Sequence, residues 1–251
     1  MTGLEQLAVL GAGVAAGAIN TIVGSGSLIT FPTLLAFGYS PVVANVSNTV
    51  GLVPGAVSGA WGYRKELAGQ GRRLLRLGIV SGTGGITGGL LLLVLPASAF
   101  KAIVPALIVL ACLLVIFQPA IARRMEERRT KVQPADGGLL MLAGLFGAGV
   151  YGGYFGAAQG VLLLGILGLG LRESLQRVNA AKNVLAGIVN GVAAVLFISV
   201  AHVAWRPALL LAAGSTIGGQ IGAKVGRRLP AGILRAIIVA VGIVAVVRLL
   251  G

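Results

Sequence analysis

Long apolar stretches separated by short basic segments are the main pattern of this chain. Several of them run to about 20 residues, the length with which an α-helix crosses a hydrocarbon core of roughly 30 Å. The pattern does not alternate with a period of two, as the strands of a membrane β-barrel would. We therefore predict an all-α fold, a polytopic transmembrane helical bundle, with ordinary spans near 42–63, 74–95, 101–118, 176–200, 206–226 and 231–250.

Two further apolar stretches, 5–38 and 138–171, are interrupted by glycines and small polar residues. The first is broken near Gly24-Ser25-Gly26-Ser27 and the second near Gly156-Ala157-Ala158-Gln159-Gly160. Such a stretch can cross the membrane once as a broken helix, or it can double back as a hairpin of two short helices. The two alternatives place the loops that follow on different sides of the membrane.

The two halves of the chain repeat one another. The run Leu95–Ile103 recurs as Leu229–Ile237, and similar pairs lie about 134 residues apart along the chain. We predict a first transmembrane repeat at 1–118, a charged cytoplasmic linker at 119–136 and a second transmembrane repeat at 137–251. Further pairs are Gly11–Val14 with Gly147–Val150, Gly78 and Gly82 with Gly214 and Gly218, and Asn45, Asn48 and Thr49 with Asn179, Lys182 and Asn183.

Composition supports a membrane protein. Hydrophobic residues make up 57% of the chain and charged residues only 10%, and the mean hydropathy is +0.97. The surface of a soluble domain needs a larger charged fraction. The net charge of +14 would suggest nucleic acid in a soluble protein, but the basic residues lie mainly between the apolar stretches. We expect membrane lipids as partners, and no nucleic acid.

The basic residues distinguish the two foldings of the interrupted stretches. If each stretch crossed once, the last basic cluster would lie opposite the first two. If each doubles back, all clusters share one side with Arg172 and Arg177, as the positive-inside rule favours. The clusters are Arg64, Lys65, Arg72, Arg73 and Arg76; Arg123, Arg124, Arg128, Arg129 and Lys131; and Arg227, Arg228 and Arg235.

We therefore predict two inverted repeats of five helical segments each, in which the first stretch of each repeat is a broken helix or hairpin. The chain is expected in the cell inner (plasma) membrane, with the basic loops in the cytoplasm and both termini outside. Inverted repeats with broken helices are typical of secondary transporters, whose substrate site lies near the midplane between the halves.

The helix breaks are the first candidate site. A break inside the membrane leaves backbone N–H groups without partners, and hydrocarbon cannot satisfy them. The N–H groups and the positive end of the following helix favour an anion, and serine hydroxyls add donors. The candidate residues here are Gly24, Ser25, Gly26 and Ser27, with Gln159 in the second break. The alternative is that the glycines only permit close helix packing, which we prefer for Gly84, Gly88, Gly218 and Gly222.

A polar stripe on the following span is the second candidate. Asn179, Lys182 and Asn183 share one helix face, and Asn45, Asn48 and Thr49 repeat the spacing in the first half. A buried ammonium is costly unless it is paired or hydrated, and no carboxylate is near Lys182 in the sequence. We interpret Lys182 as a partner for an anionic substrate. The alternative is that its side chain extends to the basic interface.

Other chemistry has little support. His202 and Cys112 are the only histidine and cysteine, so the sequence indicates no metal site, no cofactor and no catalytic residues, and we expect no enzyme. A small anionic substrate is the expected partner. A homodimer is a possible partner arrangement that the sequence does not decide.

Taken together, these features resemble the sulfite exporter TauE/SafE family. The resemblance rests on the glycine-rich break, Pro32-Thr33-Leu34-Leu35 followed by Gly38, and the segment 44–49, all in a duplicated chain. It implies a permease or exporter of sulfite, sulfonates or related organic anions. The chain departs from the family pattern in the Gly-Ser-Gly-Ser break and in the lack of a proline after the second break. An anion channel of the same architecture is the alternative function.

Overall fold

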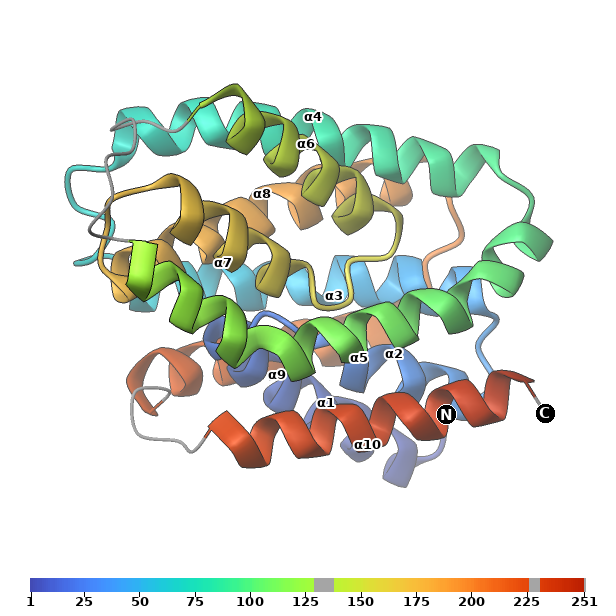
Figure 1. The fold of residues 1–251 in the computed structure, drawn as a ribbon. Coiled ribbons are helices and arrows are strands. Elements are labelled where there is room, and N and C mark those ends of the chain that lie inside the picture. The colour runs from blue at the N-terminus through green and yellow to red at the C-terminus, as the bar shows by residue number, and fades with distance from the viewer. Residues whose placement is uncertain (129–137, 226–230, 251) are drawn as a thin grey trace.

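The computed structural model describes residues 1–128, 138–225 and 231–250, and these ranges are helical throughout apart from short connections (Figure 1). The all-α prediction is confirmed. The helices are α1 (Gly3–Ile22), α2 (Ser27–Ala36), α3 (Pro41–Gly62), α4 (Gly71–Val94), α5 (Ala97–Arg128), α6 (Leu139–Tyr154), α7 (Gln159–Gly170), α8 (Leu175–Val200), α9 (Trp205–Val225) and α10 (Ala231–Leu250).

Each interrupted stretch forms two helices that double back on each other, α1 with α2 and α6 with α7 (Figure 1). The predicted five helical segments are thus present in each half. One element is longer than expected, because α5 continues to Arg128 where the predicted span ends at 118. Arg123 and Arg124 in this extension are exposed, so the helix continues past 118 without burying these charges.

The two breaks end their helices in the same way. The Gly24 amide donates to the Ile19 carbonyl at 3.0 Å, and the Gly156 amide donates to the Tyr151 carbonyl at 3.1 Å. Both glycines have positive φ, +90° and +78°, a conformation that ends helices and that side chains disfavour. Ala158, with φ of 58°, adds a second left-handed residue to the second break.

The repeats interlock through glycine faces. α1 packs along α9 of the other repeat, and its counterpart α6 packs along α4. A Cβ atom at Gly88 would lie 2.0 Å from the Val150 carbonyl oxygen, and one at Gly218 would lie 2.0 Å from the Val14 carbonyl oxygen. The backbones touch at both crossings, so the packing interpretation of the small residues is confirmed there.

These contacts correct the predicted register of one pair of helices. The sequence comparison matches Gly78 and Gly82 with Gly214 and Gly218. In the structure Gly84 faces the Phe146 carbonyl and Gly214 faces the Leu10 carbonyl, each with its Cβ position 2.3 Å from that oxygen. Gly84 is therefore the counterpart of Gly214, and the predicted match is wrong. Glycines recur so often along α4 that several registers fit the sequence.

Four of the described helices are long and apolar enough to cross a membrane: Gly3–Ile22, Gly71–Val94, Ala97–Ile121 and Leu175–Val200. α3 and α9 are of similar length but less apolar; α3 contacts both α8 and α9, and α9 also contacts α1. The half-helices α2, α6 and α7 are shorter. The chain is thus a multi-pass helical membrane protein.

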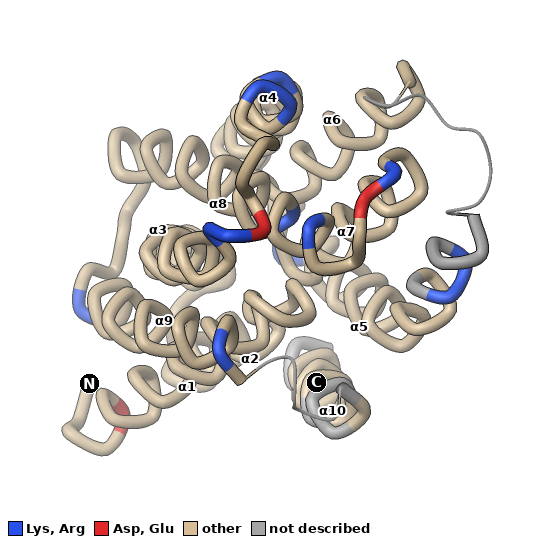
Figure 2. Tube along the Cα trace, turned by 90° about the vertical axis from the view of Figure 1, so that its left-hand side faces the viewer, with Lys and Arg blue, Asp and Glu red and all other residues tan. Residues whose placement is uncertain are grey.

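Basic residues gather at one end of the bundle, the end that faces the viewer in Figure 2. Glu173, between α7 and α8, lies 2.6 Å from the Arg73 guanidinium of α4 and 2.6 Å from that of Arg177. The connections α3–α4 and α7–α8 are therefore on the same side, as doubling back requires. Arg129, Lys131, Arg227 and Arg228 lie outside the described residues.

Corresponding helices run in opposite directions in Figure 1, where α5 runs from right to left and α10 from left to right, and both termini lie at the right-hand end. This arrangement agrees with an inverted repeat. The inversion of the repeats with respect to a membrane stays a prediction.

The glycine crossings predict a position-specific cost. Gly88→Ala places a methyl group against the Val150 carbonyl and should destabilise the protein by about 1–3 kcal/mol, a typical cost of overpacking. At Gly147, on the partner helix α6, the same change meets no atom within 4 Å. Thermal unfolding in detergent should show a lower Tm for Gly88→Ala than for Gly147→Ala. Equal Tm values would contradict the packing.

A second prediction concerns Glu173. Burial raises the pKa of its carboxyl, but the hydrogen bonds from Arg73 and Arg177 outweigh burial and hold the pKa below its ordinary value. The carboxylate therefore adds stability that is fully present above the ordinary pKa of a glutamate and is lost as the pH falls through the lowered value. Glu173→Gln should lower the Tm at neutral pH, and the difference from the wild type should vanish in acid.

The control for this change is Arg172→Gln at the exposed neighbouring position, which should show no such convergence. A Tm difference for Glu173→Gln that stays constant from neutral to acidic pH would refute the ion-pair role.

Candidate functional site

The two helix breaks meet at the centre of the bundle. The Gly160 amide donates to the Gly24 carbonyl at 3.0 Å, and a Cβ atom at Gly24 would lie 2.4 Å from the Gly160 Cα. Glycine is therefore needed at Gly24 both for its positive φ and for this contact. The contact brings together the N-terminal ends of α2 and α7, one from each repeat.

The start of α2 has hydrogen-bond donors without partners in the described part of the chain. The backbone N–H groups of Ser25 and Ser27 make no hydrogen bond within the described part of the chain, and the Ser25 hydroxyl is fully buried without a partner. The Gly26 amide is satisfied by the Asn20 side-chain oxygen at 3.1 Å. Buried polar groups are normally paired, so free donors at the positive end of a half-helix favour an acceptor or anion here.

The stripe on α8 converges on the C-terminal end of α1. The Lys182 ammonium donates to the main-chain oxygens of Asn20 at 3.0 Å and of Thr21 at 3.2 Å. The side-chain amides of Asn179 and Asn183 both donate to that same Thr21 oxygen, at 3.2 and 3.3 Å. Lys182 is 1% exposed, so the alternative that its side chain extends to the interface is wrong.

This convergence has a physical cause. The last carbonyls of a helix have no partner within it and carry the negative end of its dipole. α1 has no basic residue in its own last turn. Lys182 of the second repeat provides the positive charge that these carbonyls require.

The first repeat mirrors the arrangement without the charge. The Asn45 amide on α3 donates to the Tyr154 carbonyl at the end of α6, at 3.0 Å. Asn48 takes the place of Lys182; its side chain accepts a hydrogen bond from the Thr30 hydroxyl and donates to the Ser27 hydroxyl at 3.2 Å. Thr49 is satisfied by the Asn45 carbonyl of its own helix at 3.0 Å.

Gln159 faces away from these two clusters. Its side-chain amide donates to the Ala148 carbonyl of α6 at 3.2 Å, and its side chain lies against Gly152, where a Cβ atom would be 2.2 Å from its nitrogen. The structure therefore groups Asn179, Lys182 and Asn183 in one cluster and Ser27 and Asn48 in another, with Gln159 apart. A substrate role for any of them stays a prediction.

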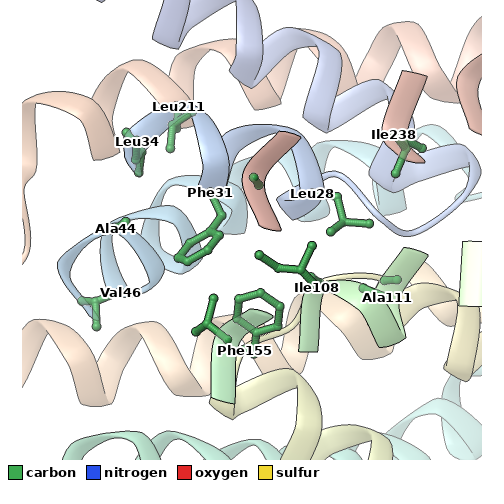
Figure 3. Close-up of a cluster of buried hydrophobic side chains, with 14 of the residues drawn as sticks. Leu28, Phe31, Leu34, Ala44, Val46, Ile108, Ala111, Phe155, Leu211 and Ile238 are labelled. Atoms are coloured by element: carbon green, nitrogen blue, oxygen red, sulfur yellow. The ribbon is translucent and has the colours of Figure 1, made fainter. Parts of the chain in front are cut away.

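A buried apolar cluster includes residues of α2 and of the second break (Figure 3). Phe31 of α2 and Phe155 of the second break meet edge to face, with ring centroids 5.3 Å apart, and Phe100 of α5 contacts Phe155 at 6.2 Å. Leu28 and Ile108 belong to the same buried cluster. Because the polar residues of the candidate site are buried as well, the conformation is closed over the site.

Sequence reasoning missed three participants. Asn20 contributes both a main-chain and a side-chain oxygen, the Thr21 carbonyl accepts three donors, and Thr30 holds Asn48. An isolated polar residue in the last turn of an apolar helix, just before a glycine break, is the signal that could have identified Asn20. In the described ranges no three His, Cys, Asp or Glu side chains come together as a metal site would need.

The sequence of this chain is similar to those of known proteins. The model of the family described as sulfite exporter TauE/SafE matches residues 9–249. The chain belongs to the TauE/SafE family. A probable membrane transporter protein of Haemophilus influenzae is 30% identical over 89% of this chain and 86% of its own length. No solved structure gives a significant match.

More distant TauE/SafE relatives carry similar names. The probable membrane transporter protein ORF9 of a Sinorhizobium species is 27% identical over 94% of this chain and 88% of its own length. The probable membrane transporter protein YfcA of Escherichia coli K12 is 26% identical over 94% of this chain and 86% of its own length. The chain is thus a membrane transporter of the TauE/SafE type, and the predicted family is confirmed.

The Gly24 contact can be tested against a matched glycine of this TauE/SafE protein. Gly38 also has positive φ, +84°, but nothing lies within 4 Å of its Cβ position. Gly38→Ala should cost about 1–2 kcal/mol, from backbone strain alone. Gly24→Ala adds a clash with Gly160 and should lower the Tm further, which thermal unfolding in detergent would measure. An equal loss for the two variants would mean that the breaks do not touch.

Proposed function

We propose that this chain is a secondary transporter, and an exporter by preference, that moves a small anion such as sulfite, a sulfonate or a related organic anion. The anion binds between the two inverted repeats, which alternate its access to the two sides of the inner membrane. The basic loops face the cytoplasm, and both termini lie outside. One observation carries the proposal: the N-terminal ends of two half-helices meet at Gly24 and Gly160, next to a buried lysine.

Charge supports an anion as the substrate. The free N–H groups of Ser25 and Ser27 and the unpartnered Ser25 hydroxyl are donors. Lys182 uses two of its three N–H bonds on carbonyls, which leaves one for a ligand. No described carboxylate contacts Lys182. A buried positive charge without a described carboxylate partner favours the binding of an anion over that of a cation.

Closure supports a carrier rather than the alternative, an anion channel of the same architecture. Phe31 and Phe155 pack edge to face, and Ser25, Asn48 and Lys182 are at most 1% exposed. An alternating-access carrier passes through such a closed state. A channel needs a continuous polar path while it conducts.

The test is anion flux into proteoliposomes in sodium-free buffer. Ser25→Ala combined with Lys182→Ala removes a hydroxyl and a charge from the site and should lower sulfite or sulfonate uptake by about 10-fold or more, because hydrogen bonds to charged groups contribute roughly 1.5–3 kcal/mol. The matched control combines Ser199→Ala with Lys65→Ala, at two exposed positions, and should transport as the wild type does.

Unaltered uptake and affinity in the Ser25/Lys182 double variant would remove these residues from the mechanism. Saturation and counterflow of labelled anion should accompany transport. Flux that rises linearly with concentration, without counterflow, would indicate the channel instead.

A further inference from the structure

Lys182 places a positive charge where broken-helix transporters bind a coupling cation. In such transporters, carbonyls at the C-terminal end of a half-helix coordinate sodium. Here the ammonium lies on the last carbonyls of α1, 3.0 Å from the Asn20 oxygen and 3.2 Å from the Thr21 oxygen. The helix ends at the Gly24 break, so these carbonyls accept hydrogen bonds from side chains outside the helix, among them the Lys182 ammonium.

We propose that the Lys182 ammonium is a built-in substitute for a monovalent coupling cation, and that removing it uncovers a sodium site. The consequence for transport, that the anion moves without sodium, rests on the proposed function. The cation site itself does not.

The oxygen atoms that the ammonium contacts are of a kind that a hard cation prefers, the main-chain carbonyls of Asn20 and Thr21. The Asn179 side-chain amide donates to the same Thr21 oxygen through its nitrogen. Its own oxygen is buried without a partner and makes no hydrogen bond to the ammonium, so it is a further acceptor on a side chain of the same cluster. Carbonyl and amide oxygens suit sodium-like cations, and a buried acceptor without a donor is costly.

In the first repeat, the position that corresponds to Lys182 carries no charge. Asn48, the counterpart of Lys182, turns to Ser27 and Thr30 of α2 instead of to the end of α6. There a single amide, from Asn45, donates to the Tyr154 carbonyl. The cationic site is therefore a property of the Lys182 side chain and is absent from the matching position of the first repeat.

A tethered charge differs from a bound ion in one respect that matters for transport. Lys182 stays with the protein on both sides of the cycle, whereas a bound sodium ion enters and leaves with its gradient. The interior charge that a sodium-coupled carrier acquires from solution is permanent here. External sodium should therefore change neither the stability of the wild type nor its rate of anion transport.

The experiment compares thermal stability of purified protein in sodium chloride and in choline chloride at equal ionic strength. Lys182→Ala opens space at the carbonyls and should be stabilised selectively by sodium, by about 3–5 °C for each tenfold rise in sodium concentration above its Kd. Lys182→Met fills the same space with an apolar side chain and should show no sodium effect. The wild type and Lys65→Ala should also show none.

Sodium stabilisation of the wild type equal to that of Lys182→Ala would overturn the proposal. So would a folded Lys182→Ala protein that does not respond to sodium, or one that cannot be recovered in sodium buffer at all. Sodium-dependent anion uptake by Lys182→Ala in proteoliposomes completes the test. If sodium stabilises Lys182→Ala but the wild type transports no anion, the proposed function fails while the cation site stands.

Discussion

Backbone groups that a helix leaves unpaired must find partners inside the protein, because the bilayer core offers none. This chain breaks two helices in its interior, and much of the central structure answers that constraint. The carbonyls at the end of α1 receive Lys182, Asn179 and Asn183, and the end of α6 receives Asn45. In each case the donor comes from the other repeat. The hydrogen bonds that satisfy the broken helix ends therefore also connect the two repeats.

The same constraint explains why the site is made of a few polar residues in an apolar surrounding. Donors at the start of α2 stay free because α1 ends just before them, and neighbouring side chains are largely committed to the carbonyls of α1 and α6. These polar residues are buried. Electrostatic interactions between buried groups are stronger than in water, so a single lysine can determine the sign of the site.

The sequence was enough to predict the helices, their breaks and the polar stripes, because each depends on local pattern: apolar length, paired glycines and polar residues at helical spacing. The partner of Lys182 could not be predicted in this way, since main-chain carbonyls leave no sequence signature. The register of α4 against α9 was wrong for a related reason. Glycines at Gly78, Gly82, Gly84 and Gly88 allow several matches, and only the contact with the Phe146 carbonyl selects one.

The glycine crossings of α1 with α9 and of α4 with α6 bear on how one half of the chain would behave alone. Each glycine face is complementary to a helix of the opposite repeat, so half of the chain alone would present an uncovered strip of backbone. A half-length chain would bury that strip against a second copy of itself in a twofold arrangement of two identical subunits. A single chain that carries both halves can place a lysine in one half where the other has Asn48, an asymmetry that a symmetric pair of identical subunits cannot have.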